Sequence, residues 1–256
     1  GVACQLLNPV DGDELARLIA HPRWGMQRKF DGRRLLVKRD GGEAMGINRR
    51  GLRTALPQPI LTAALALPGD GFLIDGEAVG DMLHAFDLLE RDGIDLRGEP
   101  YSRRLDALED LLEGHHDGAI LPVATAIGKH AKELFLRDLR RGNREGAVLK
   151  DLDAPYTPGR PASGGSQVKH KFHATASCVV AGRNQGRSVE LSLAGDDGMP
   201  VPAGNVTIPP NHAVPASGSV VEIRYLYAFQ ESGALCQPVY LGTRDDIAPE
   251  ECTVDQ

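Results

Sequence analysis

The sequence has no long apolar run, and none of its apolar stretches approaches the ~20 residues that a membrane span requires. No basic stretch followed by an apolar core opens the chain, so we expect no secretory signal. Cysteine is also scarce, and the four cysteines are far apart and form no C-x-x-C pair, which argues against a zinc site (Cys4, Cys178, Cys236 and Cys252). These absences predict a cytoplasmic protein with free thiols and no membrane partner.

A positive net charge is absent as well, because the 256 residues carry a formal net charge of −6. The charge is unevenly distributed, however. The segment from Arg28 to Arg53 contains nine basic and three acidic residues, so it carries +6 and leaves −12 for the remaining chain. A basic patch on an acidic body is typical of a localised binding site for a polyanion such as nucleic acid. A pair of exposed, solvated strands is the alternative explanation.

Hydrophobic periodicity divides the chain into two parts. Up to Phe172, helical spacing predicts helices over residues 11–20, 59–67, 102–113 and 126–141, with strands between them. In the last of these helices we expect Ile127, Ala131, Leu134 and Phe135 to face the core. After Phe172, β runs over 176–181, 188–193, 219–229 and 235–241 are separated by turns. We therefore predict an α+β domain over residues 1–172 and a small all-β barrel of OB-fold size over 173–256.

The stretch Lys29-Phe30-Asp31-Gly32-Arg33-Arg34 places a lysine among arginines and close to a carboxylate. A lysine amine attacks phosphorus only when it is neutral, and at its usual pKa near 10.4 the neutral form costs roughly 4.6 kcal/mol at pH 7. Nearby cations lower this cost because they disfavour a further positive charge. Lys29 is therefore a candidate covalent nucleophile toward a phosphate ester, with an exposed charged strand as the alternative.

Further polar residues stand at or near the ends of predicted strands, where side chains from neighbouring strands can converge. Two separated carboxylates, Glu77 and Glu145, suit Mg²⁺, which takes oxygen ligands. Lys169 and Lys171 lie on one face of a strand and suit a phosphate. Phe86 offers a flat surface on which a base could stack, although a phenylalanine in a strand more often belongs to the core.

In this order and spacing the motifs resemble the covalent nucleotidyltransferase superfamily of ATP-dependent DNA ligases, RNA ligases and mRNA capping enzymes. The stretch from Lys29 to Arg34 is similar to the K-x-D-G-x-R adenylation motif. Asn48-Arg49-Arg50-Gly51 is similar to an S-R-x-G element, with Asn48 in place of its serine. Leu241-Gly242-Thr243-Arg244-Asp245-Asp246 resembles R-x-D-K in part, because Ile247 replaces the lysine. The chain most resembles a minimal two-domain ATP-dependent DNA ligase of bacterial or phage type, with an adenylation domain followed by an OB-fold.

The resemblance implies a role for each site residue. The implied catalytic residues are Lys29, Asp31, Arg34, Lys169, Lys171, Arg244 and Asp246, with the lysine pair on the α-phosphate and Arg244 on pyrophosphate. The implied nucleotide-binding residues are Gln27, Lys29, Arg34, Glu77, Phe86, Lys150, Lys169 and Lys171, with Gln27 at the adenine edge and Phe86 stacked on the base. Glu77 and Glu145 would hold Mg²⁺ or Mn²⁺, and Arg33, Arg49 and Arg50 would contact nucleic acid.

The implied activity is ATP-dependent sealing of 5′-phosphate/3′-OH nicks in duplex DNA, through a lysyl-AMP intermediate, by a monomer. Ligation of RNA or RNA–DNA hybrids is an alternative, because the motifs are shared across the superfamily. An inactive nucleic-acid-binding module is a further alternative, which the complete set of nucleophile, carboxylates and lysine pair disfavours. A GTP-using capping enzyme is disfavoured because no triphosphatase or methyltransferase segment accompanies the motifs.

Overall fold

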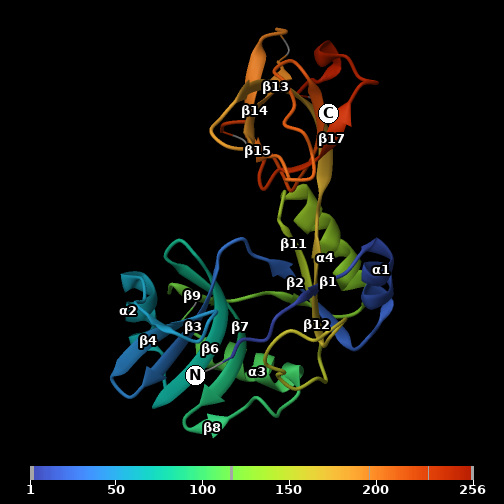
Figure 1. The fold of residues 1–256 in the computed structure, drawn as a ribbon. Helices are drawn as coiled ribbons and strands as arrows, with labels where there is room; N and C mark the ends of the chain where they lie inside the picture. The colour runs from blue at the N-terminus through green and yellow to red at the C-terminus, as the bar shows by residue number, and fades with distance from the viewer. Residues whose placement is uncertain (1–2, 116–117, 196, 230, 255–256) are drawn as a thin grey trace. The chain divides into compact units, whose positions relative to one another are not determined.

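The computed structural model describes residues 3–115, 118–195, 197–229 and 231–254. The chain divides into two compact units, Gly1–Lys171 and Phe172–Gln256 (Figure 1). The first unit contains two sheets with helices packed on them, and the second contains a third sheet. The architecture is therefore α+β in the first unit and predominantly β in the second.

The larger sheet of the first unit has the strand order β5-β4-β3-β6-β7-β8, with β9 paired to β7. Its strands are β3 (Arg33–Asp40), β4 (Glu43–Asn48), β5 (Arg53–Thr54), β6 (Gly71–Val79), β7 (Met82–Arg91), β8 (Ile94–Asp95) and β9 (Ile120–Pro122). Successive side chains on β3 enter opposite cores, so the run Leu35-Leu36-Val37 is buried throughout. Leu35 and Val37 share one core with residues of α2 (Gln58–Ala66) and α3 (Tyr101–Leu112). Leu36 packs in a second core with Tyr156.

The smaller sheet has the order β1-β12-β11-β2-β10. These strands are β1 (Asn8–Pro9), β12 (Gln167–Lys171), β11 (Gly146–Asp151), β2 (Trp24–Lys29) and β10 (Thr125–Ala126). Helices α1 (Gly12–Ala20) and α4 (Lys129–Arg141) pack beside it (Figure 1). The Asp11 side chain accepts a hydrogen bond from the backbone N–H of Glu14 and so caps α1. Because β11 runs antiparallel to both β2 and β12, the end of β2 lies beside the start of β11 and the end of β12.

Helix α4 differs from the prediction. It begins at Lys129 rather than near residue 126, because Thr125 and Ala126 form β10 instead. Four apolar residues were expected to face the core. Phe135 is half-buried, and the other three are exposed: Ile127, Ala131 and Leu134. The buried face contains Lys132 and Leu139. Lys132 Nζ donates to three backbone carbonyl oxygens at 2.7–3.0 Å, at the end of α1 and the start of β2. An apolar pattern cannot identify a buried lysine whose charge is satisfied in this way.

The second unit contains one antiparallel sheet in the order β15-β14-β13-β16-β17. Its strands are β13 (Ala174–Arg183), β14 (Ser188–Ala194), β15 (Pro200–Thr207), β16 (Val220–Tyr225) and β17 (Val239–Arg244). The edge strands β15 and β17 also contact each other, so the sheet curls around a buried core. Strand β15 is not among the predicted strands, and Pro200 and Pro202 argue against a strand there. An edge strand tolerates them, since it leaves one row of backbone groups unpaired.

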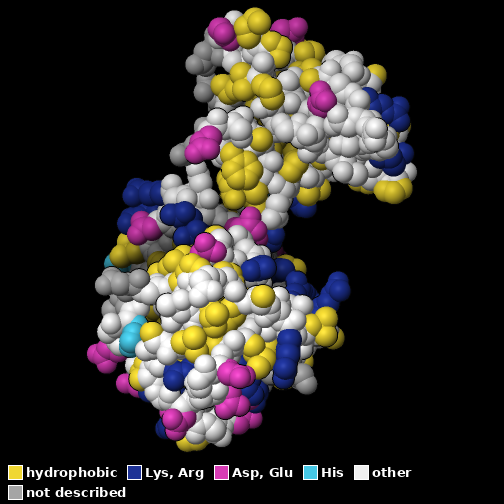
Figure 2. All heavy atoms as spheres, turned by 90° about the vertical axis from the view of Figure 1, so that its left-hand side faces the viewer, with side chains coloured by type: hydrophobic (Ala, Val, Ile, Leu, Met, Phe, Trp, Pro, Cys, Tyr) yellow, Lys and Arg dark blue, Asp and Glu magenta, His cyan; other side chains and the backbone are white. Residues whose placement is uncertain are grey.

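The surface of the first unit carries mixed charge. On the face that Figure 2 shows, basic and acidic side chains lie among apolar ones. No helix in the part of the chain that the structure describes is long and apolar enough to cross a membrane.

Candidate active site

Three strands of the smaller sheet bring charged side chains together at one edge. In the register of β2, β11 and β12, Gly146 lies opposite both Lys29 and Lys171. Glu145 directly precedes β11, and its carboxylate accepts from Lys29 Nζ at 2.6 Å and from Lys171 Nζ at 2.9 Å. The side chain of Glu145 is 3% exposed, whereas that of Lys29 is 19% exposed. One buried carboxylate thus holds two ammonium groups that would otherwise repel each other.

Glycine is required at two points around Lys29. A Cβ on Gly146 would lie 2.1 Å from the backbone oxygen of His170, so a larger residue would force β11 and β12 apart. A Cβ on Gly32 would lie 2.3 Å from the backbone oxygen of Ala78, at the end of β6 in the larger sheet. The turn that follows Lys29 therefore packs directly against that sheet, and Lys29 lies where the two sheets meet.

A cavity of about 60 Å³ lies beside Lys29. Six of the predicted nucleotide-binding residues line it: Gln27, Lys29, Arg34, Glu77, Phe86 and Lys150. Lys150 Nζ lies 4.3 Å from the centre of the Phe86 ring and donates to the Phe86 carbonyl oxygen at 3.1 Å. Burial lowers the pKa of Lys150 to about 7. The cavity therefore combines an aromatic wall with a few placed polar groups, which suits a nucleobase.

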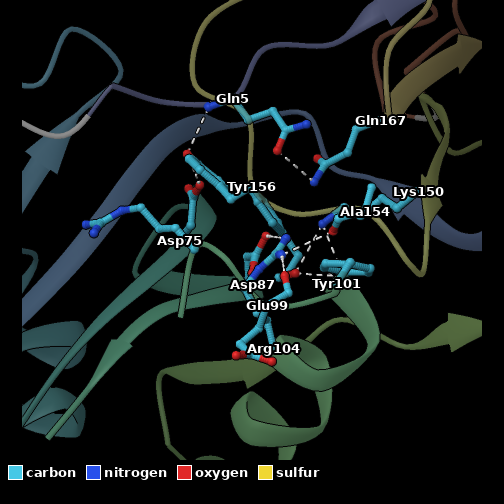
Figure 3. A network of polar contacts seen from close by, with 12 residues as sticks. Gln5, Asp75, Asp87, Glu99, Tyr101, Arg104, Lys150, Ala154, Tyr156 and Gln167 are labelled. Carbon is cyan, nitrogen blue, oxygen red and sulfur yellow. Dashed lines mark hydrogen bonds and ion pairs between the residues drawn. The ribbon is translucent and has the colours of Figure 1, made fainter. Parts of the chain in front are cut away.

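Arg34 is held rigidly at the wall of this small cavity. Its guanidinium forms a bidentate ion pair with Asp75, at 2.5 and 2.6 Å, and Asp75 is fully buried. The Tyr156 hydroxyl donates to the same carboxylate at 3.3 Å (Figure 3). The guanidinium also lies 4.6 Å from the centre of the Phe86 ring. Because both prongs of Arg34 are used by Asp75, the arginine has a fixed position rather than a mobile one.

A second and wider cavity of about 570 Å³ shares Lys29, Arg34 and Glu77 with the small one. Five further basic residues line it: Arg33, Arg49, Arg50, Arg160 and Lys169. Burial lowers the pKa of Lys169, and the positive charges of Lys29 and Lys171 lower it further. The larger cavity therefore offers concentrated positive charge directly next to the small cavity, as a polyanion site requires.

The turn after β4 presents two of these arginines to solvent. Asn48 Oδ1 accepts from the backbone N–H groups of Arg50 at 2.9 Å and Leu52 at 3.1 Å. A serine hydroxyl can form the same kind of local turn, although more weakly. Asn48 can therefore take the place of the serine in the S-R-x-G motif. Arg49 and Arg50 are exposed on the rim of the larger cavity.

Comparison with known proteins agrees with this geometry. Residues 80–171 match the model of the ATP dependent DNA ligase domain. A DNA ligase of Methanopyrus kandleri is 31% identical over 204 residues, which cover 65% of this chain and 36% of that protein. The multifunctional non-homologous end joining protein LigD of Mycolicibacterium smegmatis is 32% identical over 206 residues, which cover 71% of this chain and 26% of LigD. The chain thus contains an ATP-dependent DNA ligase domain and is similar to DNA ligases over most of its length.

Solved structures of ligases share the fold. A Lig E DNA ligase, described as binding DNA with a minimal scaffold, aligns over 95% of this chain and 100% of its own, with a TM-score of 0.64 and 20% identity. The chain spans only between 26% and 40% of the length of these and similar curated relatives.

Two carboxylates, Glu77 and Glu145, have the oxygen ligands that a magnesium ion takes. Glu77 lines both cavities, and burial raises its pKa, while the charges of Arg34 and Lys29 act in the opposite direction. The negative charge of Glu145 also raises the pKa of Glu77. Within the described residues, no group of three or more His, Cys, Asp or Glu side chains could hold a metal. Mg²⁺ often binds through one or two carboxylates together with substrate phosphates, and Glu77 and Glu145 are the two carboxylates that would supply them here.

Four predicted catalytic residues line neither of these two cavities: Asp31, Lys171, Arg244 and Asp246. Lys171 instead contacts the Glu145 carboxylate. Asp31 is exposed in the connection between β2 and β3 and lines neither cavity. Arg244 and Asp246 belong to the second unit. There Arg244 pairs with Asp246 at 2.5 Å and with Glu222 at 3.1 Å, and these contacts raise the pKa of Arg244.

Three further residues contribute to the site without a role assigned to them from the sequence, although Asp75 belongs to the Asp75-Gly76-Glu77 motif. Tyr101, the first residue of α3, is 1% exposed, and its hydroxyl contacts Gln27, Phe86 and Lys150. Asp75 neutralises Arg34, and Arg160 lines the larger cavity. Asp75 stands two residues before Glu77 in a strand and could have been suspected from that position. No sequence signal marks Tyr101 or Arg160, because their partners lie far away along the chain.

Proposed function

We propose that this chain is an ATP-dependent polynucleotide ligase, which seals 5′-phosphate/3′-OH nicks in duplex DNA through a lysyl-AMP intermediate. The observation that carries this proposal is the position of Lys29 Nζ. It lies at the junction of the small cavity that Phe86 lines and a wide basic cavity, 2.6 Å from the Glu145 carboxylate. A nucleotide base in the first cavity and phosphates toward the second would bring an α-phosphorus next to the amine.

In the first step the neutral amine of Lys29 attacks the α-phosphorus of ATP. The Nζ–P bond forms while the bond from the α-phosphorus to the bridging oxygen breaks, and pyrophosphate leaves with the electron pair. Lys29 must lose protons, and the Glu145 carboxylate is an acceptor already within hydrogen-bond distance. Lys169 and Lys171 stabilise the charge that develops on the non-bridging oxygens. Arg244 and Asp246 would orient pyrophosphate.

In the later steps AMP passes from Lys29 to the 5′-phosphate of a nick, and the 3′-hydroxyl then displaces AMP as the new phosphodiester bond forms. Arg33, Arg49 and Arg50 line the wide cavity and would hold the phosphates of the DNA strand. The first unit would act as the adenylation domain and the second as an OB-fold domain, in a monomer. Asp31 is exposed, two residues after Lys29, and would act in the step in which Lys29 attacks ATP.

Glu77 and Glu145 would hold Mg²⁺ or Mn²⁺ beside the phosphates. Such an ion, when bound, withdraws negative charge from phosphate oxygens as a Lewis acid. For Glu145 this requires that its carboxylate exchange the ammonium groups of Lys29 and Lys171 for the metal. The same exchange would release the Lys29 amine from its ion pair.

The proposal is tested by incubating the protein with α-labelled ATP and Mg²⁺. We expect covalent label that Lys29→Ala abolishes and that Lys129→Ala retains, since Lys129 is exposed on α4 and lines neither cavity. Sealing is then measured on matched nicked DNA, nicked RNA and hybrid duplexes. Label on the Lys29→Ala variant would overturn the assignment of the nucleophile, and sealing of RNA alone would overturn the assignment of the substrate.

A further inference from the structure

We infer that Tyr101 and Thr125 are positioning residues that fix the orientation of the Gln27 carboxamide, so that it presents an acceptor, and not a donor, to the base. The inference rests on the proposed function, in which a nucleotide base occupies the small cavity. It adds a physical reason for selecting adenine over guanine nucleotides, and it assigns that selection to two residues that need not touch the nucleotide.

The orientation follows from where the hydroxyl protons go. Tyr101 Oη lies 2.7 Å from the Phe86 carbonyl oxygen, so its only proton must lie between these two oxygens. The Tyr101 oxygen can then only accept from Gln27, whose nearer amide atom lies at 2.8 Å and must be the NH₂ group. If the Tyr101 hydroxyl donated to Gln27 instead, a lone pair of the Tyr101 oxygen would face a lone pair of the Phe86 carbonyl oxygen.

Thr125 leads to the same assignment from the other side. Its hydroxyl donates to the Val123 carbonyl oxygen at 3.3 Å and accepts from the Gln27 NH₂ group at 2.8 Å. Both N–H bonds of the Gln27 amide are therefore used, one by Tyr101 and one by Thr125. A flipped amide would lose both bonds, and its oxygen would face two hydroxyls whose protons point elsewhere.

Lys150 strengthens the arrangement around Tyr101. Its Nζ donates to Tyr101 Oη at 3.2 Å and to the Phe86 carbonyl oxygen at 3.1 Å (Figure 3). It also lies 4.4 Å from the centre of the Tyr101 ring. In its ammonium form Lys150 has only donors, so it then cannot supply the acceptor that a reversed Tyr101 hydroxyl would need.

The remaining amide atom, Gln27 Oε1, accepts no hydrogen bond from any residue that the structure describes. Gln27 itself lines the small cavity with Phe86 and Lys150. An unpaired acceptor here matches the exocyclic amine of adenine, which is a donor, and repels the corresponding oxygen of guanine. Selection of adenine over guanine therefore requires that the Gln27 carboxamide does not flip.

The test measures kcat/KM for covalent labelling of Lys29 with ATP and with GTP. We expect Tyr101→Phe, which keeps the ring but not the hydroxyl, to lower the ATP:GTP ratio by about 10- to 100-fold. That range corresponds to one base-edge pairing of roughly 1–3 kcal/mol. The change should appear as a higher KM for ATP with kcat nearly unchanged, together with a gain in labelling from GTP.

Tyr156→Phe is the matched control, because it removes another buried tyrosine hydroxyl of the same unit that bonds to Asp75 and not to Gln27. It should keep the wild-type ratio. Thr125→Val provides a second route, since it removes the other acceptor of the Gln27 amide and should also lower the ratio. This variant decides the question if Tyr101→Phe fails to fold.

The outcomes separate the inference from the proposed function. Absence of ATP-dependent label in the wild-type protein would refute the proposed function itself. Normal labelling combined with a wild-type ATP:GTP ratio in Tyr101→Phe would overturn only the positioning role. An equal loss with both nucleotides would likewise overturn it, because a purely structural defect does not distinguish the bases.

Discussion

The buried ion pair between Asp87 and Arg104 should decide the stability of the nucleotide-binding unit. Asp87 lies on β7 directly after Phe86, and Arg104 lies one helical turn after Tyr101 on α3. Two parallel hydrogen bonds join them at 2.8 and 3.0 Å, and the side chains are 0–1% exposed (Figure 3). The pair therefore ties β7, which contributes Phe86 to the wall of the small cavity, to α3, whose Tyr101 donates to the Phe86 carbonyl oxygen.

Replacing Arg104 by methionine should leave the Asp87 carboxylate buried without a cation. Breaking a buried pair by removing one partner costs about 3–5 kcal/mol. That is a large part of the total stability of a domain, which is about 5–15 kcal/mol. With an m-value of about 2 kcal/mol/M in urea, the unfolding midpoint should fall by about 2 M. The double variant with Asp87→Leu should recover much of this loss, since no unpaired charge remains.

Trp24, the only tryptophan of the chain, lies in the first unit, so its fluorescence during urea unfolding reports on that unit. The matched control is Arg91→Ala, which removes a salt bridge between the same two elements. Arg91 pairs with Asp110 at 2.7 Å, but the two side chains are 31% and 64% exposed. Such a surface pair is worth about 0–1 kcal/mol. Equal losses in Arg104→Met and Arg91→Ala would refute the reasoning.

Three further predictions concern charge. The pKa of Lys150 is lowered to about 7, so between pH 7 and the ordinary value the unfolded chain binds a proton that the folded chain lacks. The free energy of unfolding should therefore rise with pH in this window, by at most about 1.4 kcal/mol per pH unit. Lys150→Met should remove this slope. Equal slopes in the wild-type protein and the variant would contradict the prediction. Arg49→Ala should flatten the log–log dependence of nick affinity on salt by about 1 and spare labelling of Lys29; if labelling and sealing fall together, the variant is misfolded and the role is not supported. Glu145→Ala should lower labelling at least about 10²-fold and weaken its dependence on Mg²⁺, and an unchanged Mg²⁺ titration would argue against its metal role.

The sequence by itself determined which strands carry the charged residues. The apolar run after Lys29, the capped helix after Asp11 and the alternation around Lys169 are local signals, and the corresponding elements occur in the structure. The basic residues at the rim of the wide cavity also follow from sequence, because charge density along a short segment is a local property.

The tertiary structure alone decided which polar groups are buried and what satisfies them. Lys132 reads as a surface residue of an amphipathic helix, yet it is buried, because carbonyl oxygens more than 100 residues away accept from it. Tyr101 likewise gains its place beside Gln27 from a partner 74 residues distant. Periodicity responds to apolar side chains, whereas the free energy of a buried polar group depends on its hydrogen-bond partners. Those partners exist only once the strands and helices have packed, so no local pattern could predict them.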